Sequence, residues 1–60
     1  MKVIISKEKL GLGDIFRYNN KEWQVITVPK DSGLQGHLNV FTAREQEIGL
    51  LEYTFFNQAD

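Results

Sequence analysis

Between Ile15 and Val28 the chain alternates apolar and polar residues on both sides of an Asn-Asn step. Such alternation is typical of half-buried strands, and asparagine tolerates the left-handed backbone that a type I′ turn requires. The pattern therefore predicts a β-hairpin with Asn19 and Asn20 at its turn. The predicted cross-strand pairs are Tyr18 with Lys21, Arg17 with Glu22, Phe16 with Trp23 and Ile15 with Gln24.

Apolar segments outside the hairpin predict three more strands, at Lys2–Ile5, Leu38–Ala43 and Leu50–Phe56. Residues Ser6–Leu10 predict a polar connection that could form one helical turn. Pro29–His37 predicts a loop, because proline, glycine, aspartate and serine favour turns. Together with the hairpin, these segments give five short strands.

A sheet of five short strands must curl, because a flat sheet would leave its apolar face wet. The sequence therefore predicts an all-β fold, a small five-stranded, partly open antiparallel barrel that forms one domain over residues 1–60. The alternative is a twisted sheet with the Ser6–Leu10 turn packed against it. The pattern leaves open whether Ile15 or Phe16 faces inward. The predicted core consists of Val3, Ile5, Leu10, Ile15 or Phe16, Trp23, Val25, Leu38, Val40, Leu51, Tyr53 and Phe55.

Composition limits what can stabilise this barrel. A chain of 60 residues buries only about 60% of the surface that it exposes when unfolded, so its core is small. Without cysteine it has neither disulfides nor thiolate metal sites. The start M-K-V-I-I-S-K lacks the apolar length of a secretory signal, and no apolar run approaches the roughly 20 residues that span a bilayer. We therefore expect a cytoplasmic chain with no membrane partner.

Candidate catalytic groups are sparse. His37 is the only histidine, and a metal site would need several further ligands. Glu45 and Glu47 fall in a predicted turn over Arg44–Gly49, where we expect both carboxylates to be solvated. The G-L-G of residues 11–13 lacks the longer glycine pattern of a phosphate-binding loop. The sequence therefore predicts a binding module that is not an enzyme and has no catalytic, metal or cofactor site.

Binding to another protein is the first functional hypothesis. In the predicted register several apolar side chains lie off the main core face, and that much exposed apolar surface is unusual for a monomer. If they are exposed, they favour an unidentified protein partner or self-association, through these side chains or through a free strand edge. The alternatives are that the barrel curls enough to bury them or that the register is off by one. These candidate protein-binding residues are Phe41, Phe56, Ile26 and Leu50, together with Val28.

Nucleic-acid binding is the second hypothesis. Residues 1–30 hold six basic and three acidic side chains, whereas residues 31–60 hold one basic and five acidic, so the net charge is −1. A net charge near zero argues against strong non-specific binding to phosphates but leaves room for a local RNA site. The residues to test for RNA contact are Lys7, Lys9, Arg17, Tyr18, Lys21 and Lys30.

The order of glycine and aromatic residues also resembles a known family. The resemblance rests on K-L-G-L-G-D-I-F-R-Y-N-N-K-E-W-Q-V-I, H-L-N-V-F-T-A-R and L-E-Y-T-F, and covers roughly residues 6 to 58. These segments look like the N-terminal KOW-like domain of translation elongation factor P. The resemblance implies a Src-homology-3-like barrel and an RNA- or ribosome-associated role. That family carries a basic residue at the tip of the loop matching Pro29–Gly36, where this chain has Gln35.

Overall fold

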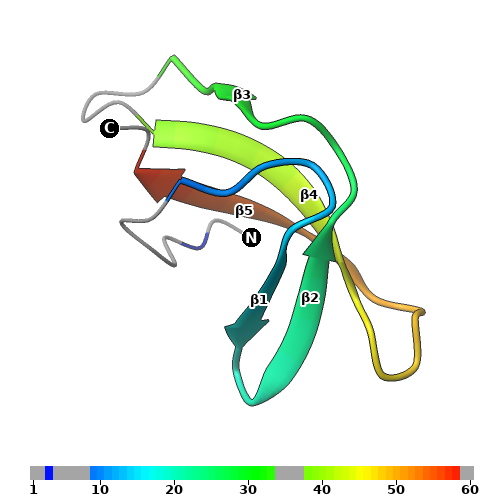
Figure 1. Ribbon diagram of the computed structural model, residues 1–60. Coiled ribbons are helices and arrows are strands. Elements are labelled where there is room, and N and C mark those ends of the chain that lie inside the picture. Colours follow the sequence, from blue (N-terminus) through cyan, green and yellow to red (C-terminus); the bar gives the residue numbers. More distant parts are fainter. Residues whose placement is uncertain (1–2, 4–8, 34–37, 59–60) are drawn as a thin grey trace.

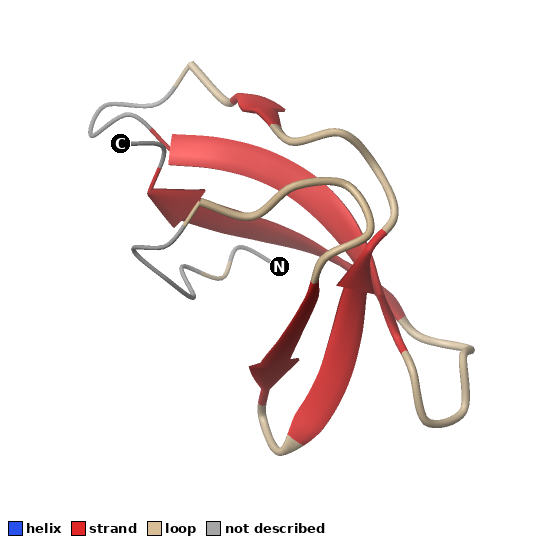
Figure 2. Cartoon of the chain, in the orientation of Figure 1, coloured by secondary structure: helices blue, strands red, loops and turns tan. Residues whose placement is uncertain are grey.

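The computed structural model describes residues 3, 9–33 and 38–58, and every regular element in this part of the chain is a β-strand (Figure 1; Figure 2). The five strands form one antiparallel sheet that is not closed, which confirms the predicted small, partly open barrel. Their bounds are β1 Ile15–Tyr18, β2 Lys21–Val25, β3 Lys30–Asp31, β4 Leu38–Glu45 and β5 Glu52–Gln58.

Strand β4 is the centre of the sheet. Strand β5 pairs along one edge of β4, while β2 and β3 share the opposite edge, β2 at residues 43–45 and β3 at residues 39–40. Strand β1 lies beyond β2 (Figure 1). Where the chain bends between β2 and β3, the Thr27 hydroxyl accepts the Thr42 amide at 2.8 Å. A side-chain oxygen thus replaces a backbone carbonyl and continues the ladder through the bend.

Strand β3 corrects the prediction that Pro29–His37 is a loop throughout. The strand begins directly after Pro29. Proline has no amide hydrogen to donate to a sheet. It is therefore tolerated at the start of a strand, where Pro29 lies. The remaining loop residues 34–37 lie outside the described part of the chain.

The predicted hairpin is confirmed pair by pair. Tyr18 is opposite Lys21, and the remaining β1 and β2 residues follow in the predicted register. Asn19 and Asn20 have φ angles of 54° and 64°. Two consecutive positive values are the signature of a type I′ turn, whose twist matches that of the flanking strands. Local sequence chemistry therefore fixes this part of the sheet.

Aromatic packing shows how far the sheet curls. Phe55 on β5 is fully buried, and its ring centroid lies 5.1 Å from that of Phe16 and 5.5 Å from that of Tyr18, both on β1. Strands β2 and β4 separate β1 from β5 in the sheet order, so these contacts cross the interior of the barrel. The indole of Trp23 is 5.2 Å from the Phe55 ring, and its N–H donates to the Tyr18 carbonyl at 3.0 Å. Phe16, and not Ile15, therefore faces inward.

The predicted face of β4 is wrong. Phe41 and Ala43 are buried, whereas Leu38 and Val40 are only half-buried. Both faces of this strand carry apolar residues, so alternation alone does not choose between them. The choice comes from pairing with β2, which places Ala43 beside the buried Val25. A one-residue error of this kind moves every side chain to the other face.

The rest of the predicted core is confirmed in part. Trp23, Val25 and Phe55 are buried, and Val3, Leu10 and Tyr53 pack against them as half-buried residues. Leu51 is exposed, because β5 begins at Glu52, two residues later than the predicted start at Leu50. Ile5 lies outside the described residues, as do most of the predicted strand Lys2–Ile5 and connection Ser6–Leu10. Within that first segment Val3 is described, is not in a strand, and accepts the Phe56 amide at 2.7 Å.

Replacing Asn20 by glycine is expected to stabilise the fold slightly. Glycine adopts the positive φ of this position without a Cβ penalty. We expect Asn20→Gly to raise the free energy of unfolding by about 0.5 kcal/mol and the melting temperature by about 2–4 °C. Thermal unfolding followed by circular dichroism measures this change. Asn20→Ala is the matched control and should lower the melting temperature, and a clear loss in the glycine variant would contradict the turn geometry.

Candidate functional site

Three large aliphatic side chains stand exposed on one short segment, residues 46–51, which we call the β4–β5 turn. Leu50 is 82% exposed, Ile48 68% and Leu51 40%. The other exposed aliphatic residues of the described chain, Leu12, Ile15 and Val28, are distributed over separate segments of the sequence. The turn therefore concentrates apolar surface at one end of the sheet, where it projects beyond β4 and β5 (Figure 1).

A buried carboxylate organises this turn. Glu45, the last residue of β4, is fully buried beside Trp23, its partner on β2. Its side-chain oxygens accept the backbone amides of Ile48 at 3.1 Å, of Gly49 at 3.3 Å and of Glu47. The three amides follow one another in the chain, so a single side chain holds the whole bend. The aliphatic side chains are consequently presented from a fixed backbone.

The electrostatic balance at Glu45 favours its charged form. Burial raises the pKa of this carboxyl, because a charge is costly to remove from water. The hydrogen bonds from the turn amides, together with the positive charge of Lys21, act in the opposite direction and outweigh burial. The net result is a pKa below the usual value of 4.5. At neutral pH Glu45 is therefore an ionised acceptor.

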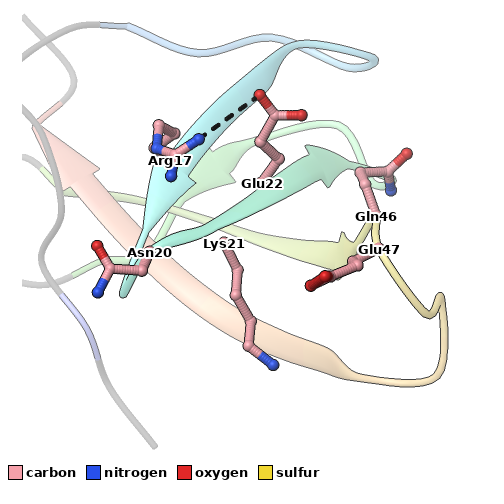
Figure 3. A pocket seen from close by; sticks show the side chains of 6 residues that line it. All are labelled: Arg17, Asn20, Lys21, Glu22, Gln46 and Glu47. Carbon is pink, nitrogen blue, oxygen red and sulfur yellow. Dashed lines mark ion pairs between the residues drawn. The ribbon is translucent and has the colours of Figure 1, made fainter.

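An open hollow of about 450 Å³ lies between the tip of the hairpin and the first residues of the turn (Figure 3). Arg17 and Glu22 face one another across the hairpin at 3.9 Å, with both side chains well exposed. The lining contains two cations, two carboxylates and two amides, so its charges cancel and it favours no ligand of one sign. The lining residues are Arg17, Asn20, Lys21, Glu22, Gln46 and Glu47.

The outer edge of β5 continues from the turn. Phe56 donates its amide to Val3, and so away from β4, whereas the carbonyl of Leu51 accepts the Glu45 amide on the β4 side. Backbone groups alternate between the two edges of a strand. The amides and carbonyls of Glu52 and Thr54 therefore point outward, and no described residue pairs with them there.

The predicted protein-binding residues separate into buried and exposed ones. Phe41 and Phe56, predicted to be exposed, are 2% and 8% exposed, so neither offers a docking surface. Phe41 belongs to the main core because β4 is turned by one residue relative to the prediction, and Phe56 is buried outside that cluster. Ile26 is half-buried. Leu50 is the predicted residue that remains exposed, and Val28 is also exposed but lies between β2 and β3.

The predicted RNA-binding residues are only partly brought together. Arg17 and Lys21 line the same hollow. Tyr18 is opposite Lys21 in the hairpin, but its ring packs against Trp23 and Phe55. Lys9 and Lys30 are exposed and do not line that hollow, and Lys7 lies outside the described residues.

Glu45 is the residue whose role the sequence interpretation missed. We expected it to be a solvated charge in a turn, whereas it is a buried strand residue that binds the turn. The available signal was its position immediately before a reversal that contains Gly49, because acidic side chains often accept backbone amides at such places. Glu47 is exposed as expected.

The described residues contain neither a candidate metal site nor a candidate membrane-spanning helix. No group of three or more histidine, cysteine, aspartate or glutamate side chains there could hold a metal ion. His37 falls outside this part of the chain. The same residues include no helix with the length and hydropathy needed to cross a membrane.

Comparisons with protein-family models, with curated proteins and with solved structures found no match for this chain. The resemblance to the elongation factor P domain therefore stays a prediction. Function has to be argued from the turn, the hollow and the edge described above.

Removing the charge of Glu45 is expected to loosen the turn and destabilise the fold. In Glu45→Gln the buried side chain loses the ionised oxygens that accept the turn amides, and its NH₂ group meets other donors. We expect a lower melting temperature at pH 7 and faster hydrogen exchange at the amides of Glu47, Ile48 and Gly49. Thermal unfolding and exchange measured by NMR test both expectations, and Glu47→Gln, which changes an exposed neighbour, should leave them unchanged.

The same substitution predicts a pH dependence. Because the pKa of Glu45 is lower in the folded than in the unfolded state, its contribution to stability is complete above about pH 4.5. It is lost as the pH falls through the folded-state pKa. The difference in melting temperature between the parent and Glu45→Gln should therefore shrink below that pH. A constant difference down to pH 2 would show that the charge of Glu45 does not stabilise the fold.

Proposed function

We propose that this chain is a small, non-enzymatic protein-interaction module of the cytoplasm that docks through the β4–β5 turn. The observation that carries the proposal is the exposure of Ile48, Leu50 and Leu51 on a backbone fixed by the buried carboxylate of Glu45. Six apolar residues are buried in the described part of the chain, and a domain of 60 residues has little stability to spare. Holding three aliphatic side chains in water on an ordered turn is best explained by their burial in a complex.

The energetics favour a partner with a complementary apolar surface. Complete burial of an aliphatic side chain contributes about 1.5–3 kcal/mol. Because the turn is already ordered, binding loses less conformational entropy than it would with a flexible loop. The outer edge of β5 next to the turn, where Glu52 and Thr54 pair with no described residue, would add backbone hydrogen bonds to an extended segment of the partner. The turn would therefore contribute apolar contacts, and the hydrogen bonds along β5 would set the orientation of the partner's segment.

An RNA- or ribosome-associated role is the second candidate. Its support is the placement of Arg17 and Lys21 in one hollow and the resemblance to the KOW-like, Src-homology-3-like domain of elongation factor P. Glu22 and Glu47 line the same hollow and would repel phosphates. The protein-interaction role is therefore the stronger proposal. RNA binding would appear as salt-sensitive NMR shifts at Arg17 and Lys21.

Replacing two of the exposed aliphatic residues is expected to abolish docking without unfolding the domain. Two buried aliphatic side chains account for about 3 kcal/mol or more, so Ile48→Ser with Leu50→Ser should weaken binding at least about 100-fold. Immobilised protein should capture a discrete partner from cell extract in its parent form and lose it in this variant. NMR spectra of each protein verify the fold.

The matched control places the same change elsewhere on the surface. Leu12→Ser with Val28→Ser also removes two exposed aliphatic side chains, and it should retain the partner. Equal loss in both variants would indicate non-specific apolar binding and would reject the β4–β5 turn as the docking site. Retention of the partner by the turn variant would reject it as well.

A further inference from the structure

The charged side chains around the β4–β5 turn do not cancel. Arg44 and Glu52 form an ion pair at 2.6 Å on neighbouring strands, and Arg17 and Glu22 face one another across the hairpin at 3.9 Å. Glu47 is exposed within the turn and forms no ion pair with any described residue. Two pairs are therefore neutral, and one carboxylate is left over.

Lys21 does not balance that carboxylate. It is the cation of the hollow that belongs to neither ion pair. Its positive charge already acts on the buried carboxylate of Glu45, whose pKa it helps to lower. One cation cannot neutralise both Glu45 and Glu47, so these three residues carry a net charge of about −1 at neutral pH. The lining of the hollow is neutral by itself, and the adjoining Glu45 makes the whole region negative.

The backbone holds the unbalanced charge in a fixed place. The Gln46 amide donates to the Glu22 carbonyl at 2.8 Å, which joins the turn to the hairpin. The next amide, that of Glu47, donates to a side-chain oxygen of Glu45. Ile48 follows directly and is 68% exposed. An ordered backbone thus presents a carboxylate and an aliphatic side chain at adjacent positions, with Glu47 at the wall of the hollow (Figure 3).

Building on the proposed function, we propose that the partner docks through a basic apolar segment, in which a lysine or arginine lies next to aliphatic residues. The aliphatic residues cover Ile48 and Leu50, and the cation binds the carboxylate of Glu47. Opposite charges at the rim of an interface mainly select the partner and speed its association, whereas like charges exclude the wrong one. The excess negative charge therefore selects against acidic segments and against phosphates.

Selection from a random peptide library displayed on phage tests this chemistry. Peptides retained by the immobilised parent protein at about 0.15 M salt should be enriched both in leucine, isoleucine or valine and in lysine or arginine. Fluorescence anisotropy then measures the affinity of a selected peptide for each variant. Glu47→Gln should weaken binding about two- to fivefold and Glu47→Lys about tenfold or more. Higher salt should reduce the difference between parent and variants.

Asp31 offers the matched control. It is exposed on β3, which pairs with β4 at residues 39–40, so about 20 Å of strand separates it from the turn. Its side-chain oxygen accepts the Gly33 amide at 2.9 Å, and asparagine retains such an oxygen. Asp31→Asn therefore removes one exposed negative charge and should bind the selected peptide as the parent does.

The outcomes separate this inference from the proposed function. Enrichment of aliphatic residues without basic ones, or of acidic residues, overturns the basic partner, as does equal affinity of the parent and Glu47→Lys. An equal loss in Asp31→Asn and Glu47→Gln also overturns it, because net charge alone would then explain binding. Docking through the turn stands in these cases if Ile48→Ser with Leu50→Ser abolishes binding. A selection that yields no peptide dependent on those two residues overturns both proposals.

Discussion

Closure of the aromatic interior is the constraint on which this structure depends. No helix or disulfide covers the sheet within the described residues, so the sheet has to cover its own apolar face. It does so by bringing Phe16 and Tyr18 of β1 onto Phe55 of β5 across the interior. Phe41 and Trp23 complete the surroundings of the same ring. The positions of the β4–β5 turn and of the outer edge of β5 follow from that curl.

The buried carboxylate of Glu45 links this core to the surface. One side of the residue lies against the aromatic interior, and its oxygens organise the backbone that displays the aliphatic side chains. Burying a charge normally costs free energy. Here the hydrogen bonds from three consecutive amides offset that cost, and these amides would otherwise lack acceptors within the bend. Stability of the core and presentation of the docking surface are therefore two effects of one side chain. A chain that lost this carboxylate could keep the barrel and still lose the shape of its turn.

Local chemistry made the hairpin predictable, whereas the central strand required knowledge of its neighbours. Asn19 and Asn20 specify both the turn type and the register of β1 with β2, so four pairs could be derived from adjacent residues. On β4, Val40 and Phe41 are both apolar, and only pairing with β2 decides which one is buried. The role of Glu45 was missed because the residue fell in a predicted turn, where an acidic side chain is expected to face water, and its position before the reversal at Gly49 was the one local signal. Strand β3 was missed because two residues after a proline give no periodic signal.

The hydrogen bond from the Trp23 indole N–H to the Tyr18 carbonyl has a practical consequence. The chain contains one tryptophan, it is 2% exposed, and it sits where β1, β2 and β5 meet. Its fluorescence is therefore an intrinsic optical probe, without any attached dye, of whether β1 and β5 remain packed on one another across the interior. Opening of the seam between the first and last strands would hydrate the indole and shift its emission to longer wavelength, while events confined to the distant loops would leave the spectrum unchanged.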